Sequence, residues 1–120
     1  MYFYGNYDII GFTHDLGLTI DEVSKFYAEL ISEINSALLE LKLLIAKQDL
    51  IKIQKTIHNI KGVSGNYRIS DIYRCTSKIN DALKNTNYTT LEEDLNHLFS
   101  VSDMAIKEIK NFFKQRYIFI

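Results

Sequence analysis

No proline interrupts this chain of 120 residues, and apolar side chains recur along most of it at intervals of three or four residues. Because proline removes a backbone donor and breaks helices, its absence leaves long helices free to form. Apolar residues at this spacing fall on one face of a helix, whereas a half-buried strand would need strict alternation. The pattern therefore predicts an all-α fold, and the length suits one domain with a single core.

The clearest predicted helix runs from Thr19 to about Lys47. Thr19 and Glu22 have the spacing of a capping box, in which the two residues satisfy each other's free backbone N–H groups. A one-sided apolar stripe follows, made of Ile20, Val23, Phe26, Tyr27, Leu30, Ile31, Ile34, Leu38, Leu41 and Ile45. This stripe predicts one buried face along the whole helix.

Three further helices are expected after it. Asp49 is a natural N-cap for the second, which should end at about residues 66–68. Ser70 can cap a third helix, and Thr90 with Glu93 forms a second capping-box pair before a fourth. Four amphipathic helices with short connections pack most simply as an antiparallel four-helix bundle.

The expected domain covers residues 1–120, with the bundle at about 19–116. A short extra N-terminal helix is expected within residues 7–15, interrupted by Gly11 and followed by Gly17. It would cover one end of the bundle.

Charge and cysteine content exclude several functions. Lys plus Arg is 14 and Asp plus Glu is 15, so the net charge of −1 gives no basic excess for nucleic acid or an anionic membrane. The single cysteine, Cys75, can form neither an internal disulfide nor a cysteine-based zinc site.

The first residues have no positive leader region, and no apolar stretch is long enough for a membrane span. A cytoplasmic protein is therefore expected.

The predicted second helix has an unusual polar face. Its apolar stripe consists of Leu50, Ile53, Ile57, Ile60, Ser64 and Tyr67, and His58 lies about 130° away from the centre of this stripe. His58 should therefore be exposed, with Gln54, Lys61, Gly62 and Gly65 on the same side. Two glycines inside a helix cost on the order of 2 kcal/mol relative to alanine, so their position calls for an explanation.

Clearance for a partner would explain the glycines. Without a Cβ, they let a second protein approach the His58 imidazole closely. Lys61 supplies a cation that disfavours imidazolium and attracts an anionic group. A surface histidine alone usually has no function, but this combination favours a site that receives an anionic group from a large partner, and the cation would attract a phosphoryl group.

The run His58-Asn59-Ile60-Lys61-Gly62-Val63-Ser64-Gly65-Asn66 resembles the signature of histidine-containing phosphotransfer (HPt) domains. That signature is a histidine, a Lys-Gly pair three and four residues later, and a small residue two positions after the glycine. The resemblance extends from Ile9 to about Phe113 and implies a four-helix bundle with the motif on the second bundle helix. It implies that His58 takes a phosphoryl group from one receiver-domain aspartate and passes it to another.

The resemblance also implies roles for neighbouring residues. Lys61 would balance the phosphoryl charge, Ser64 would pack inward beneath the site, and Asn80 on the third bundle helix would orient the histidine. The glycines Gly62 and Gly65 would leave room for the receiver.

One position departs from the family pattern. Arg68 stands where the family usually has glycine. Because a non-glycine residue cannot adopt a left-handed C-cap cheaply, the helix is expected to run on or to end differently.

No bound cofactor or metal is expected, because the phosphate-neutralising metal ion would belong to the receiver. No glycine-rich loop follows a strand, so autophosphorylation from ATP is not expected and the chain would be a phosphocarrier rather than an enzyme. His14 and His97 have no repeated metal spacing, which argues against a metal-binding bundle. Cys75 is expected to be a small buried hydrophobic residue.

The expected partners are receiver domains of response regulators or hybrid histidine kinases, bound by a monomer. Ile51 with Ile9, Ile10 and Phe12 could form an apolar docking patch beside His58. Alternatively, the three N-terminal residues only cap the core, and the sequence leaves both open. The alternative function is a non-catalytic helical adaptor that docks a signalling protein without phosphotransfer.

Overall fold

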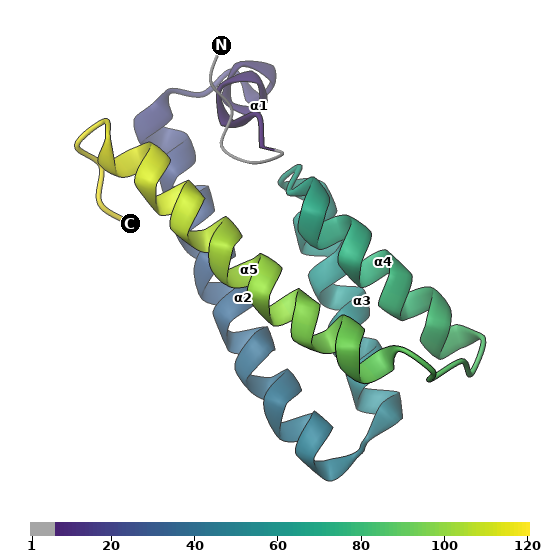
Figure 1. Cartoon of the computed structure of the whole chain (residues 1–120). Helices are drawn as coiled ribbons and strands as arrows, with labels where there is room; N and C mark the ends of the chain where they lie inside the picture. Colours follow the sequence, from purple (N-terminus) through teal and green to yellow (C-terminus); the bar gives the residue numbers. More distant parts are fainter. Residues whose placement is uncertain (1–6) are drawn as a thin grey trace.

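The computed structural model describes residues 7–120, and in that part of the chain every element longer than a single bridge residue at Tyr7 is a helix (Figure 1). The helices are α1 (Ile9–Leu16), α2 (Ile20–Lys47), α3 (Leu50–Asn66), α4 (Ser70–Lys84) and α5 (Leu91–Lys114). The all-α prediction is confirmed over these residues. The prediction that the first residues form no leader region depends partly on residues 1–6, which lie outside the described residues.

The helices pack side by side in a bundle-like arrangement measuring 43 × 23 × 21 Å. Helix α2 packs on α3 and α5, and α4 also packs on α3 and α5, so each long helix has two neighbours. Helix α1 packs on α2 and lies at the end of the molecule where α2 begins and α5 ends (Figure 1). The short helix therefore covers one end, as predicted.

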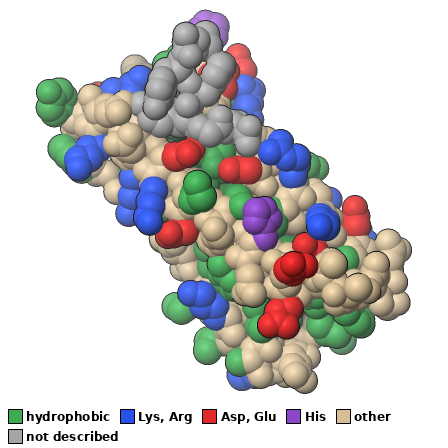
Figure 2. Space-filling model, in the orientation of Figure 1, with side chains coloured by type: hydrophobic (Ala, Val, Ile, Leu, Met, Phe, Trp, Pro, Cys, Tyr) green, Lys and Arg blue, Asp and Glu red, His purple; other side chains and the backbone are tan. Residues whose placement is uncertain are grey.

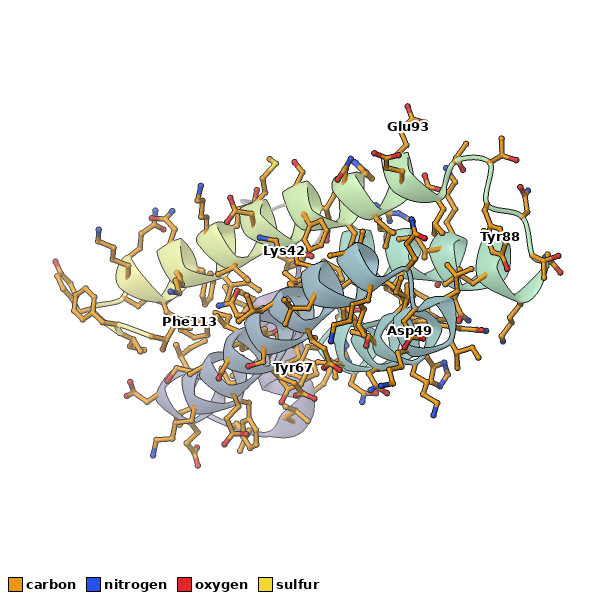
Figure 3. All side chains as sticks on the ribbon, turned by 90° about the horizontal axis from the view of Figure 1, so that it is seen from below. Lys42, Asp49, Tyr67, Tyr88, Glu93 and Phe113 are labelled. Atoms are coloured by element: carbon orange, nitrogen blue, oxygen red, sulfur yellow. The ribbon has the colours of Figure 1, made fainter. Side chains whose placement is uncertain are left out.

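An aromatic cluster joins α1 to the end of α3. Phe12 of α1 contacts the rings of Tyr27 and Tyr67, with centroids 6.0 and 5.8 Å away. Tyr27 also contacts Phe113 of α5 at 5.6 Å. In Figure 3, Phe113 lies toward one end of the molecule, Tyr67 nearer the middle, and Asp49 and Tyr88 toward the other end. The cluster fixes the C-terminal end of α3 against three other helices.

The helix starts agree only partly with the sequence predictions. The Thr19–Glu22 capping box forms with both of its hydrogen bonds, and Asp49 accepts a bond from the Lys52 N–H. The prediction for Ser70 was wrong by one position, because Ile69 is the N-cap of α4.

The second predicted capping box does not form either. Thr90 accepts no capping bond, and its hydroxyl donates instead to Asp94 Oδ2 at 2.8 Å. In addition, Phe26, expected in the buried stripe of α2, is 42% exposed.

The end of α3 corrects the expectation for Arg68. Arg68 adopts φ 58°, the left-handed conformation that usually favours glycine. The Ile69 N–H donates to the Ser64 carbonyl oxygen at 2.8 Å and the Arg68 N–H to that of Gly65 at 3.2 Å, which is a Schellman motif. The helix thus ends as a glycine-capped helix would. Left-handed residues also close the other helices of the described chain, namely Gly17, Gln48, Thr86 and Tyr117.

Replacing Thr86 by glycine should raise the free energy of unfolding by about 1 kcal/mol, because an L-residue in the left-handed region carries a strain of that order. Thr86 has φ 50°, is exposed, and its hydroxyl bonds only locally, to the Asn85 carbonyl oxygen. Urea denaturation would measure the change, and Thr89→Gly in the same loop is the control that should bring no gain. An unchanged or lower stability for Thr86→Gly would contradict the left-handed ending.

The surface carries charges of both signs. On the face shown in Figure 2, acidic and basic side chains are interspersed, without a continuous field of one sign. None of the described helices is both long and apolar enough to cross a membrane.

Candidate functional site

Buried isoleucines set the rotation of α3 and thereby expose His58. Ile57 and Ile60 are 0% and 1% exposed, so the face that carries them is fixed against the core. His58 lies on the opposite side of the helix and is exposed, as its position relative to the apolar stripe predicts. The α3 backbone is helical throughout Leu50–Asn66, so both internal glycines are accommodated without a break.

His58 lines a cavity of about 550 Å³ between the second half of α3 and the start of α4. The cavity wall brings together six residues of the HPt-like run with residues of the α3–α4 connection and of the first turns of α4. Its lining consists of His58, Lys61, Gly62, Ser64, Gly65, Asn66, Arg68, Ile69, Ser70 and Tyr73. The sequence-predicted histidine, lysine and glycines therefore share one hollow on the surface.

Gly62 and Gly65 differ in what surrounds them. Apart from its chain neighbours and the backbone of its own helix, a Cβ built on Gly62 would meet no atom of residues 7–120 within 4 Å, so there is room for a side chain. A Cβ on Gly65 would lie 3.1 Å from two ring carbons of Tyr73, which is tight. The absence of a side chain at Gly65 is therefore explained within the chain, because it leaves room for the Tyr73 ring. Only Gly62 is left without an intramolecular explanation.

Tyr73 is a site residue that the sequence reasoning missed. It stands on α4, is 42% exposed, and lines the cavity together with His58. The Lys61 ammonium lies over its ring, with Nζ 5.7 Å from the centroid. The one available signal was an aromatic residue on the exposed side of α4, and it did not reveal that the ring faces Gly65 of α3.

Ser64 and Asn80 are both buried, with different consequences. Ser64 is 0% exposed and its hydroxyl donates to the Lys61 carbonyl oxygen at 3.0 Å, beneath the site. Asn80 is 1% exposed, and neither its amide nitrogen nor its amide oxygen has a hydrogen-bond partner among residues 7–120. Asn80 therefore makes no hydrogen bond to His58 in this structure, and its role in orienting the imidazole stays a prediction.

Arg68 connects the cavity rim to α1. Its guanidinium forms an ion pair with Asp15 at 2.7 Å and lies over the Phe12 ring, 5.2 Å from the centroid. These contacts direct the charge toward α1 rather than toward His58. Arg68 lines the cavity but is engaged elsewhere.

The predicted docking patch is only partly present. Ile9 and Phe12 are 2% and 8% exposed and belong to the core, so the core-capping alternative is correct for them. Ile10 and Ile51 are exposed, at 58% and 74%, and Gln54 is half-buried. None of these five residues lines the cavity.

The remaining titratable candidates lie apart from the cavity. His14 and His97 are exposed, and no group of three or more potential metal ligands occurs within residues 7–120. Cys75 is half-buried, and burial together with the nearby Asp94 carboxylate raises the pKa of its thiol to about 11. The thiol is therefore a poor nucleophile near neutral pH.

Comparisons with protein-family models, with curated proteins and with solved structures found no match.

Proposed function

We propose that this chain is a histidine phosphotransfer protein of the HPt kind, an antiparallel four-helix bundle with a short extra N-terminal helix. In this proposal His58 relays a phosphoryl group between receiver-domain aspartates. One observation supports it most: exposed His58 shares a surface cavity with Lys61 and with Gly62, whose missing side chain the fold does not require. A nucleophile, a cation and open space are together what phosphoryl transfer from a large donor needs.

The transfer is a displacement at phosphorus. The lone pair of one imidazole nitrogen forms the N–P bond while the P–O bond to the donor aspartate breaks, and the electron pair of that bond leaves on the carboxylate. The other ring nitrogen keeps its proton or releases it to solvent. Lys61 stabilises the charge on the phosphoryl oxygens, and the metal ion that neutralises them on the donor side belongs to the receiver.

Receiver domains provide the direct test of this function. A panel of Mg²⁺-loaded receivers is phosphorylated with labelled acetyl phosphate, separated from the donor and mixed with the protein. The proposal predicts that the label moves from at least one receiver to His58 within minutes. Retention of the label on every receiver that binds the protein would contradict it.

The adaptor alternative differs from the proposal only in the chemistry. It predicts that a receiver binds wild-type protein and the His58→Gln variant equally and that no label is transferred. Exposed Ile51 near the site is the observation that favours a docking surface of either kind. Binding and transfer measured on the same receiver separate the two functions.

Replacing Gly62 should separate folding from partner access. Because Gly62 has free space around it, Gly62→Ala should raise the free energy of unfolding by about 1 kcal/mol through helix propensity. Gly62→Gln should lower the rate of receiver-supported labelling, relative to labelling by the small donor phosphoramidate, by at least about tenfold, which corresponds to about 1.4 kcal/mol.

The matched control is Ala46→Gln, which places the same side chain at an exposed position of α2 outside the cavity lining. It should leave the ratio of the two labelling rates at its wild-type value. Equal ratios in Gly62→Gln and wild-type protein would show that the open space at Gly62 does not serve a partner.

A further inference from the structure

The Lys61 side chain is held on the cavity wall by an aromatic ring rather than by a carboxylate. Its ammonium lies 5.7 Å from the centroid of Tyr73, and Lys61 is half-buried. The ion pairs within residues 7–120 involve other basic side chains. A free lysine side chain populates many rotamers, so a contact that restricts it decides where its charge lies.

The Tyr73 ring is itself fixed by α3. Two of its ring carbons occupy the space next to Gly65 where a Cβ would lie, at 3.1 Å. Tyr73 begins the second turn of α4, and its N–H donates to the Ile69 carbonyl oxygen at 3.0 Å. Gly65, Tyr73 and Lys61 thus form a chain of contacts that ends in the cavity shared with His58.

An aromatic partner has a chemical advantage at this place. A carboxylate bound to Lys61 would neutralise its charge and repel the incoming phosphoryl group. The face of an aromatic ring attracts an ammonium through its quadrupole and leaves the net charge and N–H donors available to an anion. The ring therefore localises the cation without cancelling it.

We propose that Tyr73 is a positioning residue that holds the Lys61 ammonium beside His58 for the phosphoryl group. This inference rests on the proposed phosphotransfer function and adds a residue to it. Tyr73 acts through Lys61 and does not touch the reacting atoms.

The first test measures the initial rate of His58 phosphorylation by phosphoramidate. Tyr73→Leu removes the ring and should slow labelling about three- to fivefold, the range expected for loss of an exposed cation–π contact. Tyr73→Phe keeps the aromatic face and should restore a rate close to wild type. Tyr88→Leu, a change of an exposed tyrosine outside the cavity lining, is the control.

A double-mutant cycle distinguishes positioning from a structural effect. Lys61→Gln should slow labelling, and Tyr73→Leu should add no further loss in the Lys61→Gln background, because the ring then has no cation to hold. Additive losses, or equal rates for Tyr73→Leu and wild-type protein, would overturn the inference.

A second measurement needs no phosphorylation. The ring current of Tyr73 should move the Lys61 ε-methylene proton signals upfield in wild type and in Tyr73→Phe, and Tyr73→Leu should return them to the ordinary position. Signals at the ordinary position in wild-type protein would overturn the inference by themselves. Upfield signals without any labelling of His58 would support the contact and contradict the proposed function, so the two failures are distinguishable.

Discussion

Replacing His58 by glutamine should abolish phosphoryl transfer and leave the protein folded. Glutamine keeps the polarity of the side chain but has no nucleophilic nitrogen, so acid-labile label should fall to background. His58 is exposed, so the free energy of unfolding should change by no more than about 0.5 kcal/mol. Label counting on the intact protein and urea denaturation measure the two effects.

His97→Gln is the matched control, because His97 is also an exposed histidine within a long helix. It should retain full labelling and wild-type stability. Label that persists in the His58→Gln variant would place the acceptor elsewhere. Unfolding of that variant would show that the imidazole supports the core, against the exposure found for it.

Replacing Asn80 by leucine should raise the free energy of unfolding by about 2 kcal/mol, because a buried unpaired polar group costs about 1–3 kcal/mol. Both amide atoms of Asn80 are buried without a hydrogen-bond partner among residues 7–120, and leucine, which branches at the same carbon but is apolar, removes that cost. Urea denaturation measures the gain.

Thr76→Val on the same helix is the matched control for Asn80. The Thr76 hydroxyl is equally buried, but it donates to the Ile72 carbonyl oxygen at 2.8 Å, so valine should bring no comparable gain. A loss of stability in Asn80→Leu would contradict this prediction. A large fall in His58 labelling would support the orienting role that the resemblance implies for Asn80.

Much of the fold follows from local sequence signals. The stripe on α2 and the capping box at Thr19 predict that helix within one residue, because the signals for its start, face and end agree. The conformation of Arg68 was harder to predict. Its left-handed backbone is strained, and the contacts that offset this strain come from Asp15 and Phe12 of α1, which is far from Arg68 in the sequence. Thr90 also failed as a cap, because its hydroxyl bonds the Asp94 side chain instead.

In the candidate site too, features that depend on one helix were predictable and contacts between helices were not. Helical periodicity alone places His58, Lys61 and Gly62 on one exposed side, because all three lie on one element. Tyr73 comes from α4, and nothing in a single sequence states which α4 residue faces Gly65. Ile9 and Phe12 were ambiguous for a similar reason, since an apolar side chain in a short helix can face either the core or a partner.

Phosphoramidate labelling followed by peptide mapping tests the central claim most directly, because it asks about His58 without requiring an identified partner. The protein carries three histidines, and His14 and His97 are both exposed, so they serve as controls for general accessibility within the same molecule. The account predicts acid-labile phosphate on His58 alone. Equal label on all three histidines, or no label on His58, would contradict it.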